Sequence, residues 1–213
     1  MCGTWSLVGI ENDLPLVNAK TYQANYTNEW GVYHTYRLLK NITGMWCLQE
    51  IACLTDYQFS YQEMAEQAAS VHAFLQEIDL NHDRFNNPKN MIEEIQAACR
   101  ESGQPIPKTV GELVMCVYSN LARIYARELK QLEDLSGKTI DYLHVVGGGS
   151  NVSLLNQLTA NLIGKEVIAG PGEATAIGNI LVQMISVGEF ENLSQARHWL
   201  ASSSSFECYR PQI

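Results

Sequence analysis

Three consecutive glycines, Gly147–Gly149, follow the apolar run YLHVV at 142–146 and precede the polar pair Ser150 and Asn151. Glycine has no Cβ, so it suits places where the chain turns sharply or where the backbone approaches a ligand closely. A helical pattern over 150–163 comes next, so the glycines occupy a strand-to-helix turn. Two interpretations stay open here: a tight structural turn, or a backbone surface against which a ligand packs.

The glycine run completes neither of two common phosphate-binding motifs. A dinucleotide fingerprint, G-x-G-x-x-G, would begin at Gly147 but has Val152 where its third glycine belongs. A Walker A motif would end at 137–139, yet Leu132 stands in place of its first glycine. A more general hypothesis remains, because ligands of open α/β sheets bind at the carboxyl ends of strands. The helix that follows, capped by Ser150 or Asn151, would direct the free N–H groups of its first turn toward a ligand at that end of the strand.

Two other groups of residues carry chemistry that suits a ligand. Asn41 and Gln49 lie eight residues apart within a helix predicted from Tyr36 to about Leu54, so their amides project about 80° apart around its axis. They form one amide-bearing stripe, unless both amides simply face solvent. Gly3 and Thr4 begin the first predicted strand, where a hydroxyl beside a glycine could hold a phosphate oxygen.

The composition is that of a globular protein and excludes some partners. The chain has 213 residues, 46% of them hydrophobic and 17% charged, which is enough for a sizeable core. The net charge is −9 and no basic run is present, so nucleic acid is not expected as a partner. No apolar window of about 18 residues predicts a transmembrane helix. The N-terminal residues lack the pattern of a signal peptide, so a cytoplasmic protein without membrane contact is expected.

The six cysteines show neither a CxxC motif nor a metal-ligand spacing with histidine. In a reducing cytosol, free thiols are expected for most of them. Cys99 and Cys116 bracket a proline-containing turn between two predicted helices, where their side chains could meet. A disulfide and a pair of core thiols both stay open for these two residues, and no metal site is predicted.

The order of the predicted elements indicates one α/β domain. Strands are expected at 3–9, within 21–37, at 140–146 and at 165–169. Helices are expected at 36–54, 60–78, 88–100, 109–135, 150–163, 173–187 and 192–201. Capping boxes at Ser60–Glu63 and Thr109–Glu112 mark two of the helix starts. The N-terminal strands would have to pair with the late strands in a mixed sheet.

Four segments, in this order, resemble the C-terminal domain of the FGGY carbohydrate kinases. They are GTWSLVG at 3–9, LKNITGMWCLQE at 39–50, VVGGGSNVSLLNQLTANLIGKEV at 145–167 and PGEATAIGNILVQM at 171–184. The resemblance covers essentially the whole chain. It implies an α/β, ribonuclease-H-like domain of the actin/Hsp70/hexokinase superfamily, with a mixed sheet flanked by helices. Residues 1–213 would be a single domain, the ATP-side half of a two-domain kinase whose N-terminal sugar-binding domain is absent from this chain.

The resemblance also implies roles for individual residues. A hairpin at the start of the first strand meets the ATP phosphates, two amides contact the nucleotide, and the central glycine of the triplet packs against adenosine. The residues at these positions are Gly3 and Thr4, Asn41 and Gln49, and Gly148 between the turn-forming Gly147 and Gly149. The segment Glu173–Gly178 resembles the second interdomain connecting helix. Ser150, where some relatives have other small residues, is not expected to disturb binding.

The implied reaction is transfer of the γ-phosphoryl group of ATP, with Mg²⁺, to the C1 hydroxyl of L-rhamnulose. No aspartate or histidine here forms a convincing catalytic group, so the general base is expected in the N-terminal domain. The chain alone is therefore expected to be inactive and to bind ATP weakly, and its freed domain interface could self-associate. Two alternatives stay open: half of another FGGY kinase acting on fuculose, xylulose or a related sugar, and a stand-alone, non-catalytic nucleotide-binding module.

Overall fold

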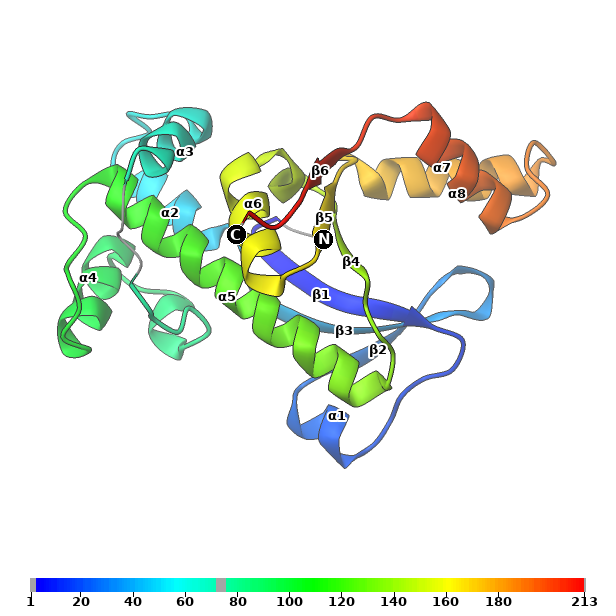
Figure 1. Cartoon of the computed structure of the whole chain (residues 1–213), viewed down its shortest axis with the longest axis horizontal. Helices are drawn as coiled ribbons and strands as arrows, with labels where there is room; N and C mark the ends of the chain where they lie inside the picture. The colour runs from blue at the N-terminus through cyan, green and yellow to red at the C-terminus, as the bar shows by residue number, and fades with distance from the viewer. Residues whose placement is uncertain (1–2, 72–75, 213) are drawn as a thin grey trace.

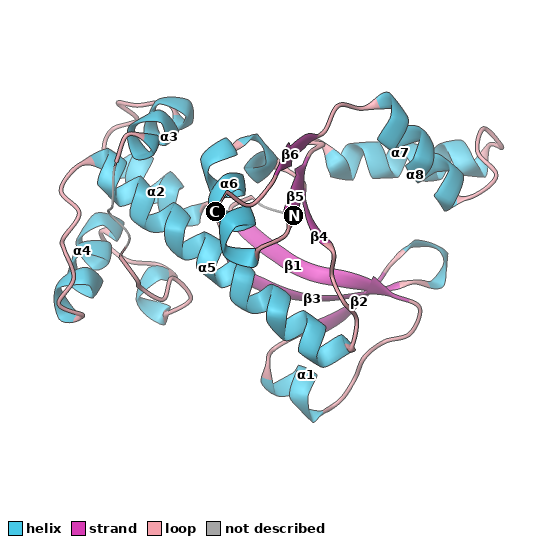
Figure 2. Ribbon diagram, viewed as in Figure 1, coloured by secondary structure: helices cyan, strands magenta, loops and turns pink. Residues whose placement is uncertain are grey.

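The computed structural model describes residues 3–71 and 76–212, and its strands form two three-stranded sheets (Figures 1 and 2). The first sheet is antiparallel, in the order β1 (Trp5–Asn12), β3 (Tyr36–Thr43), β2 (Thr27–Trp30). The second has the order β4 (Tyr142–Val145), β5 (Glu166–Ala169), β6 (Glu207–Tyr209). In that sheet β4 and β5 are parallel, and β6 is antiparallel to β5.

The long helix α5 (Val110–Ser136) crosses the larger part of the molecule, whereas α7 (Ala174–Ser186) and α8 (Leu193–Ser203) lie apart from it (Figure 1). The remaining helices are α1 (Ala19–Gln23), α2 (Trp46–Leu54), α3 (Tyr61–Ala69), α4 (Met91–Glu101) and α6 (Ser153–Ile163). Helices α3 and α6 and strand β1 all pack on α5. Most of α5 is buried, so it forms the centre of the hydrophobic core.

The fold class agrees with the prediction: helices pack against sheets, one of which is mixed. The expected pairing of the N-terminal strands with the late strands is not observed, because each group forms its own sheet within the described residues. Strand β6 was not predicted, since three residues in a polar tail are too few to show a period.

The helix predicted from Tyr36 to Leu54 is wrong in its first half. Strand β3 occupies Tyr36–Thr43, and helix α2 begins only at Trp46. Leu38 and Ile42 are both buried, and a separation of four residues places side chains on one face of either a helix or a strand. Pairing with β1 on one side and β2 on the other decides for a strand.

Both capping boxes are confirmed. Ser60 and Glu63 cap α3 reciprocally, and Thr109 and Glu112 do the same at the start of α5. Helix α3 ends at Ala69, well before the predicted end near residue 78, and part of that predicted segment, 72–75, lies outside the described residues. The capping box therefore predicted the start of α3 correctly, whereas the predicted end of the helix lay too far along the chain.

The second capping box makes a specific pH dependence testable. The Glu112 carboxylate accepts hydrogen bonds from the backbone N–H groups of Lys108 and Thr109, at 2.6 Å and 2.9 Å, and these bonds lower its pKa. Because the folded pKa lies below the unfolded value of about 4.3, the stabilisation is complete above that value and is lost as the pH falls through the folded pKa. We expect thermal melts between pH 3 and 7 to show a melting temperature that falls on acidification. Glu112→Gln should reduce the fall; an identical pH profile would contradict this role.

Cys99 and Cys116 are brought together in the core, as the sequence suggested, but both are free thiols. Each is fully buried. A hydrogen bond with Cys99, together with burial, raises the pKa of the Cys116 thiol. Of the two interpretations left open, the structure has the pair of core thiols.

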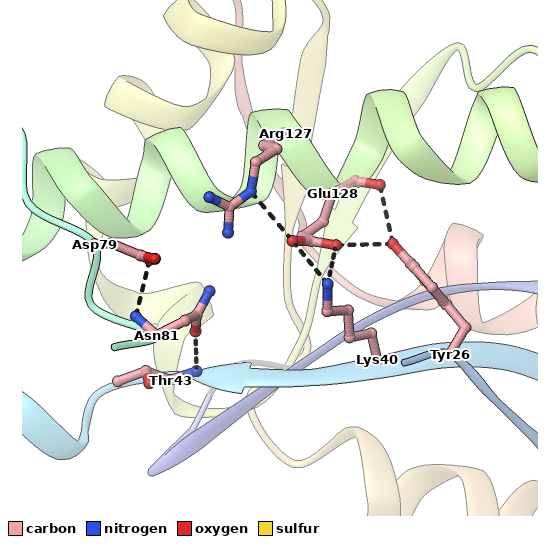
Figure 3. A network of polar contacts seen from close by, with 7 residues as sticks. All are labelled: Tyr26, Lys40, Thr43, Asp79, Asn81, Arg127 and Glu128. Carbon is pink, nitrogen blue, oxygen red and sulfur yellow. Dashed lines mark hydrogen bonds and ion pairs between the residues drawn. The ribbon is translucent and has the colours of Figure 1, made fainter. Parts of the chain in front are cut away.

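A buried ionic cluster joins α5 to the first sheet (Figure 3). Glu128 on α5 is 1% exposed, and Lys40 Nζ on β3 lies 3.2 Å and 3.1 Å from its two carboxylate oxygens. Tyr26 donates its hydroxyl to the same carboxylate at 3.0 Å, and Arg127 Nε donates to it at 3.3 Å. Burial and the Glu128 charge raise the pKa of Tyr26. This cluster fixes how the sheet that carries Asn41, and that Thr4 directly precedes, lies against α5.

Candidate functional site

A cavity of about 730 Å³ lies where the start of β1, helices α2 and α3, and the glycine turn meet. Its size is that of a typical small-molecule site. The residues that line it are Gly3, Thr4, Met45, Gln49, Tyr61, Gln62, Ala65, Glu66, Ala69, Gly148, Gly149, Asn151, Val152, Ser153 and Leu154. Segments that are far apart in the sequence therefore converge on one site, including most of the residues proposed from the sequence.

Thr4 and Gln49 form one polar corner of this cavity. Gln49 Nε2 donates a hydrogen bond to Thr4 Oγ1 at 3.1 Å. The backbone N–H groups of Met45 and Trp46 donate to the carbonyls of Gly3 and Thr4, at 2.8 Å and 3.1 Å, which fastens the start of β1 to the start of α2. Because the Thr4 oxygen accepts from the amide, its own proton is available to an acceptor in the cavity.

Gly44 holds this corner closed, and sequence reasoning did not single it out. It lies between β3 and α2, and a Cβ there would lie 2.5 Å from the carbonyl oxygen of Gly3 and 2.7 Å from the backbone nitrogen of Ser6. Only glycine allows the β3–α2 junction to approach the start of β1 so closely.

We expect Gly44→Ala to lower the free energy of unfolding by about 1–3 kcal/mol, the usual cost of overpacking. Urea denaturation measures this. It should also weaken ligand binding, because Gly3 and Thr4 must shift. Gly172→Ala is the matched control, since its nearest neighbour would be an amide nitrogen at 3.7 Å. A Gly44→Ala protein as stable as Gly172→Ala would contradict the close approach.

The three glycines of the turn have different roles. Gly147 has φ of +84°, a conformation that favours glycine, and its N–H donates to the carbonyl of Pro171 at 3.2 Å. Gly148 and Gly149 line the cavity, whereas Gly147 does not. At Gly148, φ is not positive and a Cβ would meet nothing within 4 Å. The fold therefore has no steric need for glycine at Gly148, while a side chain there would extend into open space beside the cavity.

The predicted side-chain cap of the helix after the turn is wrong. Helix α6 has Val152 as its N-cap, with no side-chain hydrogen bond to its first turn. Ser150 instead donates its hydroxyl back to the carbonyl of Gly147 at 2.7 Å. Ser153 and Leu154, the first residues of α6, line the cavity. An uncapped N-terminus with its positive dipole end thus lies at the site, an arrangement that suits a bound anion.

Asn41 does not share the cavity with Gln49. It lies on strand β3, opposite Leu7 of β1, and is exposed. Alternation along β3 places it on the sheet face opposite Lys40, the same face as Trp5. The single amide stripe predicted for Asn41 and Gln49 is therefore wrong, because one amide lies on a strand and the other on a helix.

Helix α3 forms a wall of the cavity that sequence reasoning missed. It contributes Tyr61, Gln62, Ala65, Glu66 and Ala69. A Cβ at Gly111 of α5 would lie 2.8 Å from the carbonyl oxygen of Gln67, so this glycine lets α3 approach α5 closely. The capping box predicted the helix, but only the packing on α5 shows which of its faces borders the cavity.

The electrostatic character of the cavity comes from backbone dipoles and one carboxylate. None of its lining residues is Lys or Arg, and Glu66 is the only acidic one. In the described part of the chain, no group of three or more His, Cys, Asp or Glu side chains is placed to hold a metal ion. None of the helices within the described ranges is long and apolar enough to cross a membrane.

Comparison of the chain with known proteins identifies its family. Residues 1–187 match the model of the C-terminal domain of the FGGY family of carbohydrate kinases. The chain is 51% identical over 210 residues to a rhamnulokinase of Ligilactobacillus salivarius (strain UCC118), covering 99% of this chain and 43% of that protein. It is 52% identical over 210 residues to a rhamnulokinase of Enterococcus faecalis (strain ATCC 700802 / V583), covering 98% and 42%. The chain thus spans less than half the length of these relatives.

Among solved structures, the xylulose kinase from Rhodospirillum rubrum superposes with a TM-score of 0.69 at 15% identity. The match covers 99% of this chain and 41% of that one. At this identity the similarity shows a shared fold. Together with the family match over residues 1–187, it leads to one conclusion: this chain belongs to the FGGY family of carbohydrate kinases and corresponds to their C-terminal domain.

Proposed function

We propose that this chain is the ATP-binding half of a kinase that phosphorylates L-rhamnulose. The convergence of Gly3, Thr4, Gln49 and Gly148 on one cavity carries the proposal, because these residues come from three distant segments. The names of the relatives that are about 50% identical supply the sugar. In the reaction, the C1 oxygen of the sugar attacks the γ-phosphorus, the bond to the ADP oxygen breaks, and a base on another domain takes the hydroxyl proton.

The cavity residues fit a nucleotide. The Thr4 hydroxyl and the uncapped N-terminus of α6 would hold phosphate oxygens, while Gly148 would allow the adenosine to lie flat against the backbone. Apolar side chains such as Met45 and Leu154 would surround the base. Gln49 would act by orienting Thr4, with which it is hydrogen-bonded. Mg²⁺ would be bound mainly through the nucleotide phosphates.

We still propose that Asn41 contacts the nucleotide, but from a different position than the sequence suggested. Its strand pairs with β1, whose first residues follow Thr4, so it would act from the sheet face beside the cavity rather than from within it. A contact of this kind would be completed by closure of a second domain over the sheet.

The exposed apolar surface of α7 supports the presence of that second domain in the working enzyme. Leu181 is the only buried residue of this helix, while Ile180 is 55% exposed and Val187, just after it, is 76% exposed. Surfaces of this kind usually mark an interface. The segment Glu173–Gly178 would connect the domains, and a domain corresponding to the unmatched part of the relatives would cover α7.

A fusion protein tests the function. The part of the Ligilactobacillus salivarius protein that this chain does not match is joined before residue 1, and ADP release is measured with L-rhamnulose, L-fuculose or D-xylulose. We expect turnover with L-rhamnulose by the fusion and none by the chain alone. A folded fusion that binds ATP but phosphorylates no sugar would refute the kinase assignment. Preference for another sugar would refute only the assignment of L-rhamnulose as the substrate. Turnover by the chain alone would refute the proposal that the chain is half of an enzyme.

A further inference from the structure

Glu66 is an unusual residue to find at a site for a polyanion. It lies on α3 facing the cavity, and no Lys or Arg of the described residues forms an ion pair with it. A carboxylate repels phosphate groups, and the lining residues contain no cation to offset that repulsion. The part of a phosphate-bearing ligand that suits this carboxylate is therefore a neutral hydrogen-bond donor.

Gln62 is hydrogen-bonded to this carboxylate, and both side chains are exposed at the cavity wall. Gln62 Nε2 donates to Glu66 Oε1 at 2.9 Å, across one turn of α3. One carboxylate oxygen is engaged in this way, and an ionised carboxylate has further acceptor capacity. The pair thus presents an oriented acceptor on the α3 wall, with Ala65 and Ala69 on the same wall providing apolar contact.

The donors for phosphate lie on other walls of the cavity. Thr4 directly precedes β1 and Ser153 begins α6, whereas Glu66 is on α3. A nucleotide whose phosphates meet Thr4 and the N-terminus of α6 leaves its nucleoside for the remaining lining. Ribose hydroxyls and the adenine amino group are neutral donors, the chemistry that a free carboxylate oxygen accepts.

We propose that Glu66, oriented by Gln62, recognises the nucleoside by accepting hydrogen bonds from its ribose hydroxyls or its amino group, a role that rests on the proposed nucleotide site. Glu66 then determines specificity for the nucleoside, separately from the phosphate contacts. The same carboxylate would disfavour ligands made of phosphate alone.

Titrations followed by protein NMR, which resolves weak binding, compare the wild-type chain with Glu66→Gln. ATP should bind the variant about three- to tenfold more weakly. With 2′,3′-dideoxy-ATP the difference should vanish if Glu66 contacts the ribose, and with ITP it should vanish if Glu66 contacts the amino group. Inorganic tripolyphosphate should bind the variant at least as tightly as the wild type, because a repelling charge is gone.

Glu93→Gln is the matched control, since Glu93 is an exposed helical glutamate of α4 outside the cavity. It changes the net charge equally and should leave ATP binding unchanged. Equal ATP affinity in Glu66→Gln and wild type would overturn the proposal, as would a difference that persists with both analogues. Either outcome refutes only the role of Glu66 when the wild type binds ATP and Gly148→Val binds it far more weakly, because the nucleotide site itself is then supported. A wild type that binds no nucleotide refutes the site itself.

Discussion

Gly148→Val should weaken ATP binding about 10- to 100-fold while leaving the fold intact. The valine side chain would occupy the space beside the cavity into which a Cβ at this position points, since that Cβ meets nothing within 4 Å. Inserting carbons into occupied space typically costs about 1–3 kcal/mol, which corresponds to this range of affinity. The protein has no φ strain or packing contact at Gly148 that valine would disturb, so its melting temperature should stay close to that of the wild type.

The control is Gly178→Val in helix α7. A Cβ at Gly178 also meets nothing within 4 Å, and the residue does not line the cavity. In the isolated chain this variant should bind ATP as the wild type does. If Gly148→Val and Gly178→Val bind equally well, the nucleotide does not pack against the glycine turn. If Gly148→Val unfolds the protein, the glycine has a structural role that the geometry does not show.

Glu128→Ala should have the largest effect on stability, a loss of about 3–5 kcal/mol in the free energy of unfolding. Removing this carboxylate leaves Lys40, whose side chain is only 20% exposed, without its partner, and the Tyr26 hydroxyl loses its acceptor as well. Breaking a buried ion pair costs this much because the remaining charge stays desolvated. Chemical denaturation measures the change, and Glu128→Gln, which keeps an acceptor, should cost less.

Two further variants separate burial from charge. Glu29→Ala removes an ion pair with Arg37 whose two side chains are 47% and 52% exposed, so it should cost about 0–1 kcal/mol. The double variant Lys40→Met with Glu128→Leu removes both charges and should be far more stable than Glu128→Ala alone. A loss of less than about 1 kcal/mol in Glu128→Ala would mean that the cluster does not fasten the sheet to α5.

The sequence predicted those parts of the fold that depend on local chemistry. The capping boxes placed the starts of α3 and α5 because a Ser or Thr three residues before Glu satisfies backbone donors wherever it occurs. The glycine pattern placed a turn between a strand and a helix, whereas the choice of Gly148 as the member facing a ligand came from the family resemblance. The structure is consistent with that choice, since Gly147 needs its positive φ and Gly148 does not.

The sequence could not show features that depend on long-range packing. Strand β3 was mistaken for a helix because Leu38 and Ile42 fit both periods, and only pairing with β1 and β2 decides between them. Gly44 and Gly111 owe their roles to backbone that is distant in sequence. The α3 wall, with Glu66, is likewise invisible until α3 packs on α5.

The most direct measurement is an NMR titration of the isotope-labelled chain with ATP, followed residue by residue. The proposed site predicts shifts at Gly3, Thr4 and Gln49, along residues 148–154 and on the cavity face of α3, with little change in α4 or at the buried Glu128 cluster. It also predicts that Gly148→Val strongly reduces these shifts at the same ATP concentration. Shifts confined to other surfaces, or none at millimolar ATP, would contradict a nucleotide site in this cavity.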